Sequence, residues 1–154
     1  MTSINAPLKR CFDLSRSIDL HLISAGDNRE EAVAGRVSGF IQLHEVVTWR
    51  AKHFGFWFTL TSAISKMQLY DSFTDEMADG PFKSLTHQHL FEVIDGKTIM
   101  KDVFTFASPY GFLGKLADEF VLSAYLKKFL EKSNEFITGY AESDRWKEIP
   151  GFIF

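Results

Sequence analysis

Residues 73–106 read FTDEMADGPFKSLTHQHLFEVIDGKTIMKDVFTF, and they contain three runs whose side chains alternate between two faces. Turn residues separate the runs, Asp79-Gly80-Pro81 after the first and Asp95-Gly96 after the second. Alternation with a period of two predicts β-strands, and such short turns predict antiparallel hairpins. One face of these runs mixes large apolar residues with acids and imidazoles: Phe73, Asp75, Met77, His87, His89, Phe91, Met100, Asp102, Phe104 and Phe106.

This mixed face predicts a sheet that lines an internal cavity. Burying a polar group without a partner costs about 1–3 kcal/mol, so a plain apolar core would not carry two acids and two imidazoles. A cavity wall tolerates them, because a ligand or water can satisfy them there. Sixteen phenylalanines in the chain fit the same idea, since rigid aromatic rings can wall a cavity as well as fill a core.

Composition narrows the class of protein. A chain of 154 residues with 45% hydrophobic and 24% charged residues is most simply one globular domain. The net charge of −3 gives no electrostatic case for nucleic acid. Cys11 is the single cysteine, so no intrachain disulfide and no cysteine-based zinc site is expected. No apolar run approaches the ~18 residues of a membrane span, and Met1–Ala6 does not resemble a signal peptide, so we expect a cytoplasmic protein without stable membrane insertion.

The segments before residue 73 add short helices and further strands. Expected elements are a strand stub at Thr2–Asn5, a helix with Pro7 in its first turn, a helix over Ser17–Leu22 capped by Ser17, and strands over Ala32–Val37, Val46–Phe54 and Phe56–Lys66. In the strand from Val46, one side carries Val47, Trp49, Ala51 and His53. Successive hairpin-like joins predict a meandering antiparallel sheet.

After the sheet, the period of the apolar residues becomes helical. An apolar stripe predicts one amphipathic helix from about Leu113 to Glu142. Leu116, Phe120, Ala124 and Phe129 are expected to form the cavity wall opposite the sheet. We divide the chain into a ligand-binding domain, residues 1–142, and a tail, residues 143–154. The aromatic tail is expected to cover an edge or the cavity mouth, to join a homodimer contact, or to be a mobile terminus.

Six pieces of the sequence resemble the START-like, Bet v1-like superfamily, often labelled SRPBCC. They are Ile4-Asn5-Ala6-Pro7-Leu8 with Phe12-Asp13-Leu14, Val47-Thr48-Trp49-Arg50-Ala51, Asp75-Glu76-Met77 with Gly80-Pro81-Phe82, His87-x-His89-x-Phe91-Glu92, Asp102-Val103-Phe104 and Ser108-Pro109-x-Gly111. They are most similar to the bacterial ligand-binding branch called polyketide cyclase/dehydrase-like. The resemblance implies an α+β helix-grip fold, in which a curved antiparallel sheet surrounds a long C-terminal helix. It also implies a cavity for lipids, polyketides or other aromatic molecules.

His87 and His89 lie on one face of a strand, about 7 Å apart along it. With Asp75 or Asp102 they fit three chemistries: buried hydrogen-bonded pairs, polar ligand contacts or proton transfer, and a metal site of two histidines and a carboxylate. We expect the first two, with no metal and no cofactor. His53 with Asp75 is a further candidate for a general base and its orienting partner.

The expected function is therefore binding of an apolar or aromatic small molecule. The expected ligand contacts are Trp49, His53, Phe73, Asp75, Met77, His87, His89, Phe91, Asp102, Phe104, Phe120 and Ala124. Two other classes stay open. One is a cyclase or dehydratase-type enzyme, with His87, His89, Asp75 and Asp102 as the candidate catalytic residues. The other is a co-chaperone-like module that binds a partner protein through the sheet or the tail.

Overall fold

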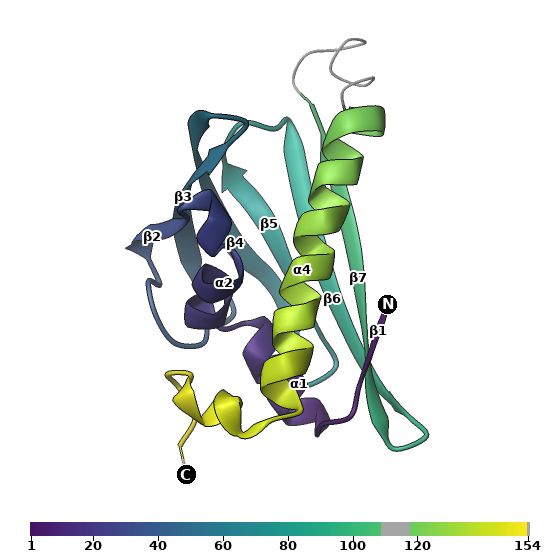
Figure 1. The fold of residues 1–154 in the computed structure, drawn as a ribbon. Helices are drawn as coiled ribbons and strands as arrows, with labels where there is room; N and C mark the ends of the chain where they lie inside the picture. Colours follow the sequence, from purple (N-terminus) through teal and green to yellow (C-terminus); the bar gives the residue numbers. More distant parts are fainter. Residues whose placement is uncertain (109–117, 154) are drawn as a thin grey trace.

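The computed structural model describes residues 1–108 and 118–153, in which a curved antiparallel sheet wraps around one long helix (Figure 1). The strands are β1 (Thr2–Ile4), β2 (Glu31–Gly35), β3 (Val46–His53), β4 (Phe56–Gln68), β5 (Ser72–Asp79), β6 (Ser84–Ile94) and β7 (Lys97–Ala107). The helical elements are α1 (Leu8–Ser15), α2 (Ile18–Ser24), η1 (Gly26–Asn28), η2 (Asp118–Leu122), α4 (Ser123–Ala141) and η3 (Asp144–Glu148). This architecture confirms the predicted helix-grip fold.

The described strands form one sheet in the order β1-β7-β6-β5-β4-β3-β2. Strands β2 to β7 follow one another as an antiparallel meander, as predicted. The stub β1 crosses to the far edge, where Thr2 lies opposite Met100 of β7. There β1 also contacts α4, which crosses the face of the sheet (Figure 1).

The turn at Asp95-Gly96 sets the register of the two strands that carry the histidines and Asp102. Asp95 and Gly96 have φ values of 51° and 77°, as expected for a two-residue turn whose twist matches that of the flanking strands. Glycine adopts such angles without steric cost, and aspartate is among the residues that tolerate them. The resulting register places His89 opposite Asp102 and His87 opposite Phe104.

Helices α1 and α2 support one end of the sheet. Ser17 caps α2, and its Oγ accepts a hydrogen bond from the Leu20 N–H at 3.2 Å, as the sequence predicts. Phe12 of α1 is fully buried, and its ring centroid lies 5.3 to 5.5 Å from those of Tyr70, Phe73 and Phe91. This aromatic cluster fills the space between α1 and the sheet.

The long helix runs over the concave face of the sheet, but two of its predicted wall residues point elsewhere. The predicted start near Leu113, and the wall residue Leu116, lie outside the described residues. Phe120 is 69% exposed and Ala124 is also exposed, so the placement of both on the cavity wall is wrong. In an α-helix, residues two positions apart in the sequence point in directions that differ by about 200°. Ala124 therefore lies on the side opposite Leu122 and Leu126, which face the cavity.

The C-terminal segment folds back onto the core. Ile149 is only 3% exposed and belongs to the same buried cluster as Phe12. The Arg10 guanidinium lies 4.4 Å from the centroid of the Trp146 ring, and Phe152 packs edge-on against Phe40 at 4.9 Å. The alternative of a free terminus is therefore wrong for this segment. In the described part of the chain, no helix is long and apolar enough to cross a membrane.

Candidate ligand cavity and histidine cluster

A cavity of about 1000 Å³ lies between the concave face of the sheet and α4. Most of its lining is apolar. On the helix side these residues are Val121, Leu122, Leu126, Phe129, Leu130 and Ile137, and on the sheet side they include Val47, Trp49, Ala51, Phe58, Leu60, Ile64, Phe73 and Phe104. The predicted alternation of β3 holds, because Val47, Trp49, Ala51 and His53 all face this space. The concave sheet and the covering helix therefore enclose an apolar chamber with a minority of polar groups.

Seven of the twelve residues predicted to contact a ligand line the cavity: Trp49, His53, Phe73, Asp75, His87, His89 and Phe104. The other five, Met77, Phe91, Asp102, Phe120 and Ala124, are not among its lining residues. Met77 pairs with Ser62, which lines the cavity, but the Met77 side chain itself is not among the lining residues. Phe91 has the expected strand parity, but α1 covers that part of the sheet and Phe91 packs on Phe12 instead.

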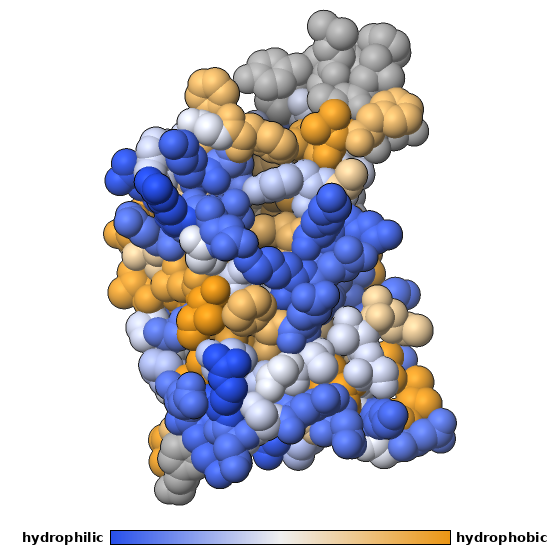
Figure 2. Space-filling model, in the orientation of Figure 1, coloured by the Kyte–Doolittle hydropathy of each residue, from blue (hydrophilic) through white to orange (hydrophobic). Residues whose placement is uncertain are grey.

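Apolar side chains are also exposed at one end of the molecule. They belong to the tip of the β3–β4 hairpin and to η2, and they are Phe54, Phe56, Trp57, Phe58, Phe120 and Val121. Figure 2 shows apolar surface at this end, above the band of charged residues on α4. Phe54, Phe58 and Val121 also line the cavity, so this exposed surface is continuous with the cavity lining.

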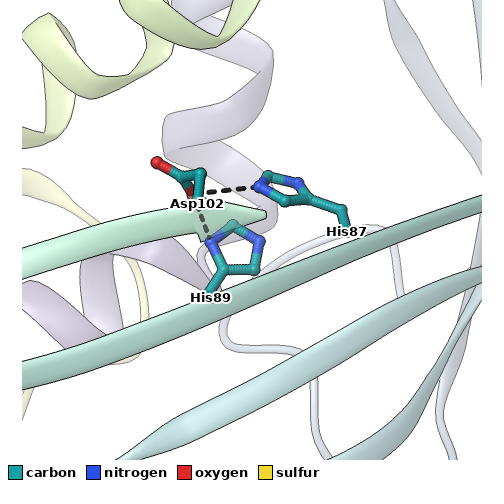
Figure 3. Close-up of side chains that lie close together, drawn as sticks. All are labelled: His87, His89 and Asp102. Carbon is teal, nitrogen blue, oxygen red and sulfur yellow. Dashed lines mark hydrogen bonds and ion pairs between the residues drawn. The ribbon is translucent and has the colours of Figure 1, made fainter. Parts of the chain in front are cut away.

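The strongest polar feature of the site is a cluster of His87, His89 and Asp102 (Figure 3). His87 Nε2 lies 2.9 Å from Asp102 Oδ1, and His89 Nδ1 lies 3.1 Å from the same oxygen. The other oxygen, Oδ2, accepts a hydrogen bond of 2.7 Å from the Asn134 side-chain amide on α4. The cluster thus joins β6, β7 and the long helix. Asp102 holds the two imidazoles, which themselves face the cavity.

The two imidazoles are not equally satisfied. His87 makes a hydrogen bond with Asp102, whereas His89 Nδ1 is buried and lacks a hydrogen-bond partner among the described residues despite its short distance to the carboxylate. The ring of His89 is stacked on Phe73 at 4.1 Å and lies 3.8 Å from the ring of His87. Phe104 packs edge-on against His87 at 5.2 Å. These aromatic contacts hold both imidazoles in place.

Burial and neighbouring charges set the protonation of this cluster. Burial, together with the adjacent His87, lowers the pKa of His89 to about 4, although Asp102 acts in the opposite direction. Burial opposes ionisation of Asp102, but the adjacent imidazoles of His87 and His89 outweigh it and hold the pKa of this carboxyl well below its usual range. Near pH 7 the cluster therefore contains an ionised carboxylate beside a neutral His89.

Asp75 lines the same wall, but it does not complete the cluster. It lies opposite His87 across β5 and β6, and its Oδ1 is buried without a hydrogen-bond partner in the described part of the chain. Burial raises its pKa, against smaller opposing effects of His87 and Ser62. His53, the candidate partner of Asp75 from the sequence, lies with its Nδ1 2.5 Å from the Tyr125 hydroxyl.

A second polar group in the cavity escaped the sequence analysis. His21 of α2 makes a 3.0 Å hydrogen bond with Glu30, and its ring lies 4.4 Å from that of Trp49. Burial alone would lower the pKa of His21, but the charge and hydrogen bond of Glu30 raise it above the ordinary value. The Glu30 side chain is only 7% exposed, and its Oε2 lacks a partner among the described residues.

The polar residues of the cavity that the sequence did not reveal differ in how far their positions indicated burial. Glu30 lies in a loop next to a weak strand, where no periodicity marks it as buried. Tyr125 and Asn134 were detectable in principle, because both lie within the apolar stripe of the helix. A polar residue on such a stripe indicates a buried hydrogen bond, which Asn134 does form with Asp102.

Comparison with known proteins supports the fold. No family model matches the sequence, and no curated protein matches it either. Among solved structures, TTHA0849 from Thermus thermophilus superposes with a TM-score of 0.69 at 14% identity, covering 91% of this chain and 95% of that one. Ara h 8.0201 gives 0.68 at 17% identity over 91% and 93% of the two chains.

Ginseng major latex-like protein 151 from Panax ginseng gives a TM-score of 0.66 at 16% identity, covering 92% of this chain and 94% of that one. Identities this low establish the fold and nothing finer. The element order, the sheet topology and these superpositions agree: the chain has the helix-grip fold of the Bet v1-like proteins.

Proposed function

We propose that the protein binds a small apolar or aromatic molecule in the cavity between the sheet and α4. The observation that carries the proposal is the cavity itself, about 1000 Å³ in volume and walled mainly by aliphatic and aromatic side chains. Pockets that bury drug-sized ligands have volumes of about 300–1000 Å³ and a lining of this kind. Burying ~300 Å² of apolar ligand surface at about 25 cal/mol per Å² gives a gross ~7 kcal/mol before association costs, which is compatible with micromolar binding.

The polar groups of the cavity suggest where the ligand carries its own polar atoms. Asp75 Oδ1 and Glu30 Oε2 are buried acceptors without partners in the described part of the chain, and both side chains line the cavity. A buried acceptor left unpaired costs about 1–3 kcal/mol, and a hydroxyl or amine on the ligand would remove that cost. The ligand we propose is therefore mainly apolar and carries at least one hydrogen-bond donor.

Native mass spectrometry of freshly purified protein, with a denatured control, tests the proposal directly. We expect a labile excess mass of a few hundred daltons that disappears on denaturation. In parallel, the neutral fluorescent probe N-phenyl-1-naphthylamine is titrated into wild-type protein and two variants. Ser133→Phe places a ring in the cavity from α4, and Ala124→Phe places the same ring on the exposed face of that helix.

Filling the cavity should weaken probe binding by at least tenfold in Ser133→Phe and leave it unchanged in Ala124→Phe. Circular dichroism of both variants confirms that they remain folded. Equal probe affinity in the wild type and both variants, with no excess mass in the native spectrum, would contradict the proposal.

One observation favours a second function, an enzyme of the cyclase or dehydratase type. His87 faces the cavity and is hydrogen-bonded to the ionised Asp102 behind it, which is the arrangement of a general base and its orienting group. The molecule identified in the native spectrum is incubated with the protein, and its mass is followed over time. An enzyme should convert it about 100-fold more slowly after His87→Gln while still binding it, whereas a carrier converts nothing.

A further inference from the structure

We propose that His87, His89 and Asp102 form a binding site for one divalent transition-metal ion, with an open coordination position toward the cavity. This goes against the expectation from the sequence, where the metal was the alternative that we did not favour. It also goes beyond the proposed function, because binding of an apolar molecule does not require it.

The spacing of the donor atoms carries the proposal. The ligand atoms of the three residues lie within 4.8 Å of one another, and both imidazole nitrogens converge on Asp102 Oδ1 at 2.9 and 3.1 Å. An ion bonded to nitrogen and oxygen at about 2.1 Å holds neighbouring ligand atoms about 3.0–3.4 Å apart in octahedral or tetrahedral geometry. The two nitrogen–oxygen separations come close to that range, whereas donor atoms as much as 4.8 Å apart must move closer together to share one ion, because two bonds of about 2.1 Å span at most about 4.2 Å.

Hydrogen bonding accounts for only one of these two contacts. The pair of His87 with Asp102 is a normal hydrogen bond, but His89 Nδ1 lies close to the same oxygen without the geometry of one. His89 is about nine-tenths buried, so water does not readily supply the missing partner. An ion between the three residues would give this nitrogen a partner, and so explain why it points at a carboxylate oxygen that is already engaged.

The surroundings resemble those of a built metal site. Asn134 donates to Asp102 Oδ2, which leaves Oδ1 as the oxygen directed toward the imidazoles. Phe73 stacks on His89 and Phe104 packs on His87, so both rings are fixed before any ligand binds. Outer-shell hydrogen bonds and locked rings of this kind orient metal ligands and strengthen binding.

The donor set also indicates which ions would bind. Two imidazoles and one carboxylate suit Zn²⁺, Fe²⁺, Co²⁺ and Ni²⁺, whereas Ca²⁺ and Mg²⁺ prefer sites made of oxygen atoms. Three protein ligands leave at least one coordination position free. His87 and His89 both line the cavity, so that position would face the bound molecule.

Cobalt(II) titration of tag-free protein, first treated with EDTA and dialysed, tests the site. We expect visible d–d absorption bands that saturate at one ion per chain and that Zn²⁺ abolishes by competition. His89→Gln and Asp102→Asn should remove these bands. Asn134→Ala keeps all three ligands and should weaken Co²⁺ binding by about 10–100-fold, because it removes the hydrogen bond that orients Asp102, along with a longer one to Thr2.

Two matched histidine variants serve as controls. His44→Gln removes an exposed histidine, and His53→Gln removes a cavity histidine outside the cluster, so both should bind Co²⁺ like the wild type. The proposal is overturned by unchanged Co²⁺ spectra in a folded His89→Gln variant, or by wild-type protein that shows no saturable bands. Probe binding to the cavity is measured on the same samples, so loss of the metal site and loss of the ligand site are distinguished.

Discussion

His87 donates a hydrogen bond of 2.9 Å to Asp102, although the residue directly opposite His87 in the β6–β7 hairpin is Phe104. Asp102 lies opposite His89 instead, and it reaches diagonally to the imidazole one pleat away. Diagonal neighbours on one face of an antiparallel pair lie about 7–8 Å apart at Cα, within reach of long side chains. Both imidazoles therefore share one carboxylate, and Asn134 holds that carboxylate from the helix.

Removing this carboxylate should destabilise the fold. Asp102→Ala leaves His87 and Asn134 without their common acceptor in a buried position, and we expect a loss of about 3–5 kcal/mol in the free energy of unfolding. Urea denaturation at pH 7 measures the loss. Asp79→Ala, which removes an exposed aspartate at the end of β5, should stay within about 0.5 kcal/mol of the wild type. Equal stability of the two variants would mean that the cluster contributes nothing to the fold.

The aromatic cluster under α1 predicts a large effect of one core truncation. Phe12 is fully buried against Tyr70, Phe73 and Phe91, so Phe12→Ala should lower the free energy of unfolding by about 3–5 kcal/mol. Phe56→Ala is the matched control, since Phe56 is mostly exposed at the β3–β4 hairpin. Thermal unfolding followed by circular dichroism compares the two. A small shift for Phe12→Ala would show that α1 is not docked on the sheet as described.

Two isoleucines near the C-terminus test whether the tail belongs to the folded domain. Ile149 is 3% exposed and Ile153 is 97% exposed, although both lie in the same short segment. Ile149→Ala should cost about 2–4 kcal/mol in the free energy of unfolding, whereas Ile153→Ala should change it by less than about 0.5 kcal/mol. Urea denaturation of both variants measures the difference. If neither variant is destabilised, the boundary predicted after residue 142 describes the domain better.

The ion pair of His21 and Glu30 predicts a pH-dependent contribution to stability. The pKa of His21 is raised in the folded protein, so the folded state binds its proton more tightly than the unfolded chain does. The resulting stabilisation is fully present below the unfolded pKa of about 6.5, and it is lost as the pH rises through the raised folded value. Compared with His21→Gln, the wild type should therefore gain most stability near pH 6 and progressively less at higher pH.

Urea denaturation of both proteins at a series of pH values measures this difference. His44→Gln is the control, because His44 is exposed and makes no ion pair within the described part of the chain, so its effect should not vary in the same way. A stability difference for His21→Gln that is constant from pH 6 to alkaline pH would contradict the predicted role of Glu30.

Local sequence patterns predicted many of the helices, strands and turns. The two-residue alternation and the Asp95-Gly96 turn predicted β6 and β7, and Ser17 marked the start of α2. These features depend on neighbours along the chain, so they can be read without the tertiary structure. The alternation of side chains along each strand likewise placed His87 and His89 of β6 on the same face of the sheet as Phe73 and Asp75 of β5.

Alternation along a strand or helix did not predict correctly which residues line the cavity where the packing of another element matters. Phe91 shares its side of β6 with His89, but α1 packs over that end and makes Phe91 part of the core. Met77 pairs with the cavity-lining Ser62 and yet does not line the cavity itself. Phe120 and Ala124 are apolar, yet the rotation of the helix against the sheet turns them outward. Apolarity alone does not reveal which side of an element will be covered.

The sequence by itself determined the order of helices and strands, the sharp turns between them, and the unusual mixture of imidazoles, acids and aromatic rings on one face of the sheet. Only the tertiary structure decided which acid the imidazoles meet. Asp75 and Asp102 looked equivalent in the sequence, but the hairpin register and Asn134 on α4 direct Asp102 to both histidines and leave Asp75 facing the cavity with an unpaired oxygen. Such choices depend on distances of a few ångströms between segments far apart in the chain, which local periodicity does not encode.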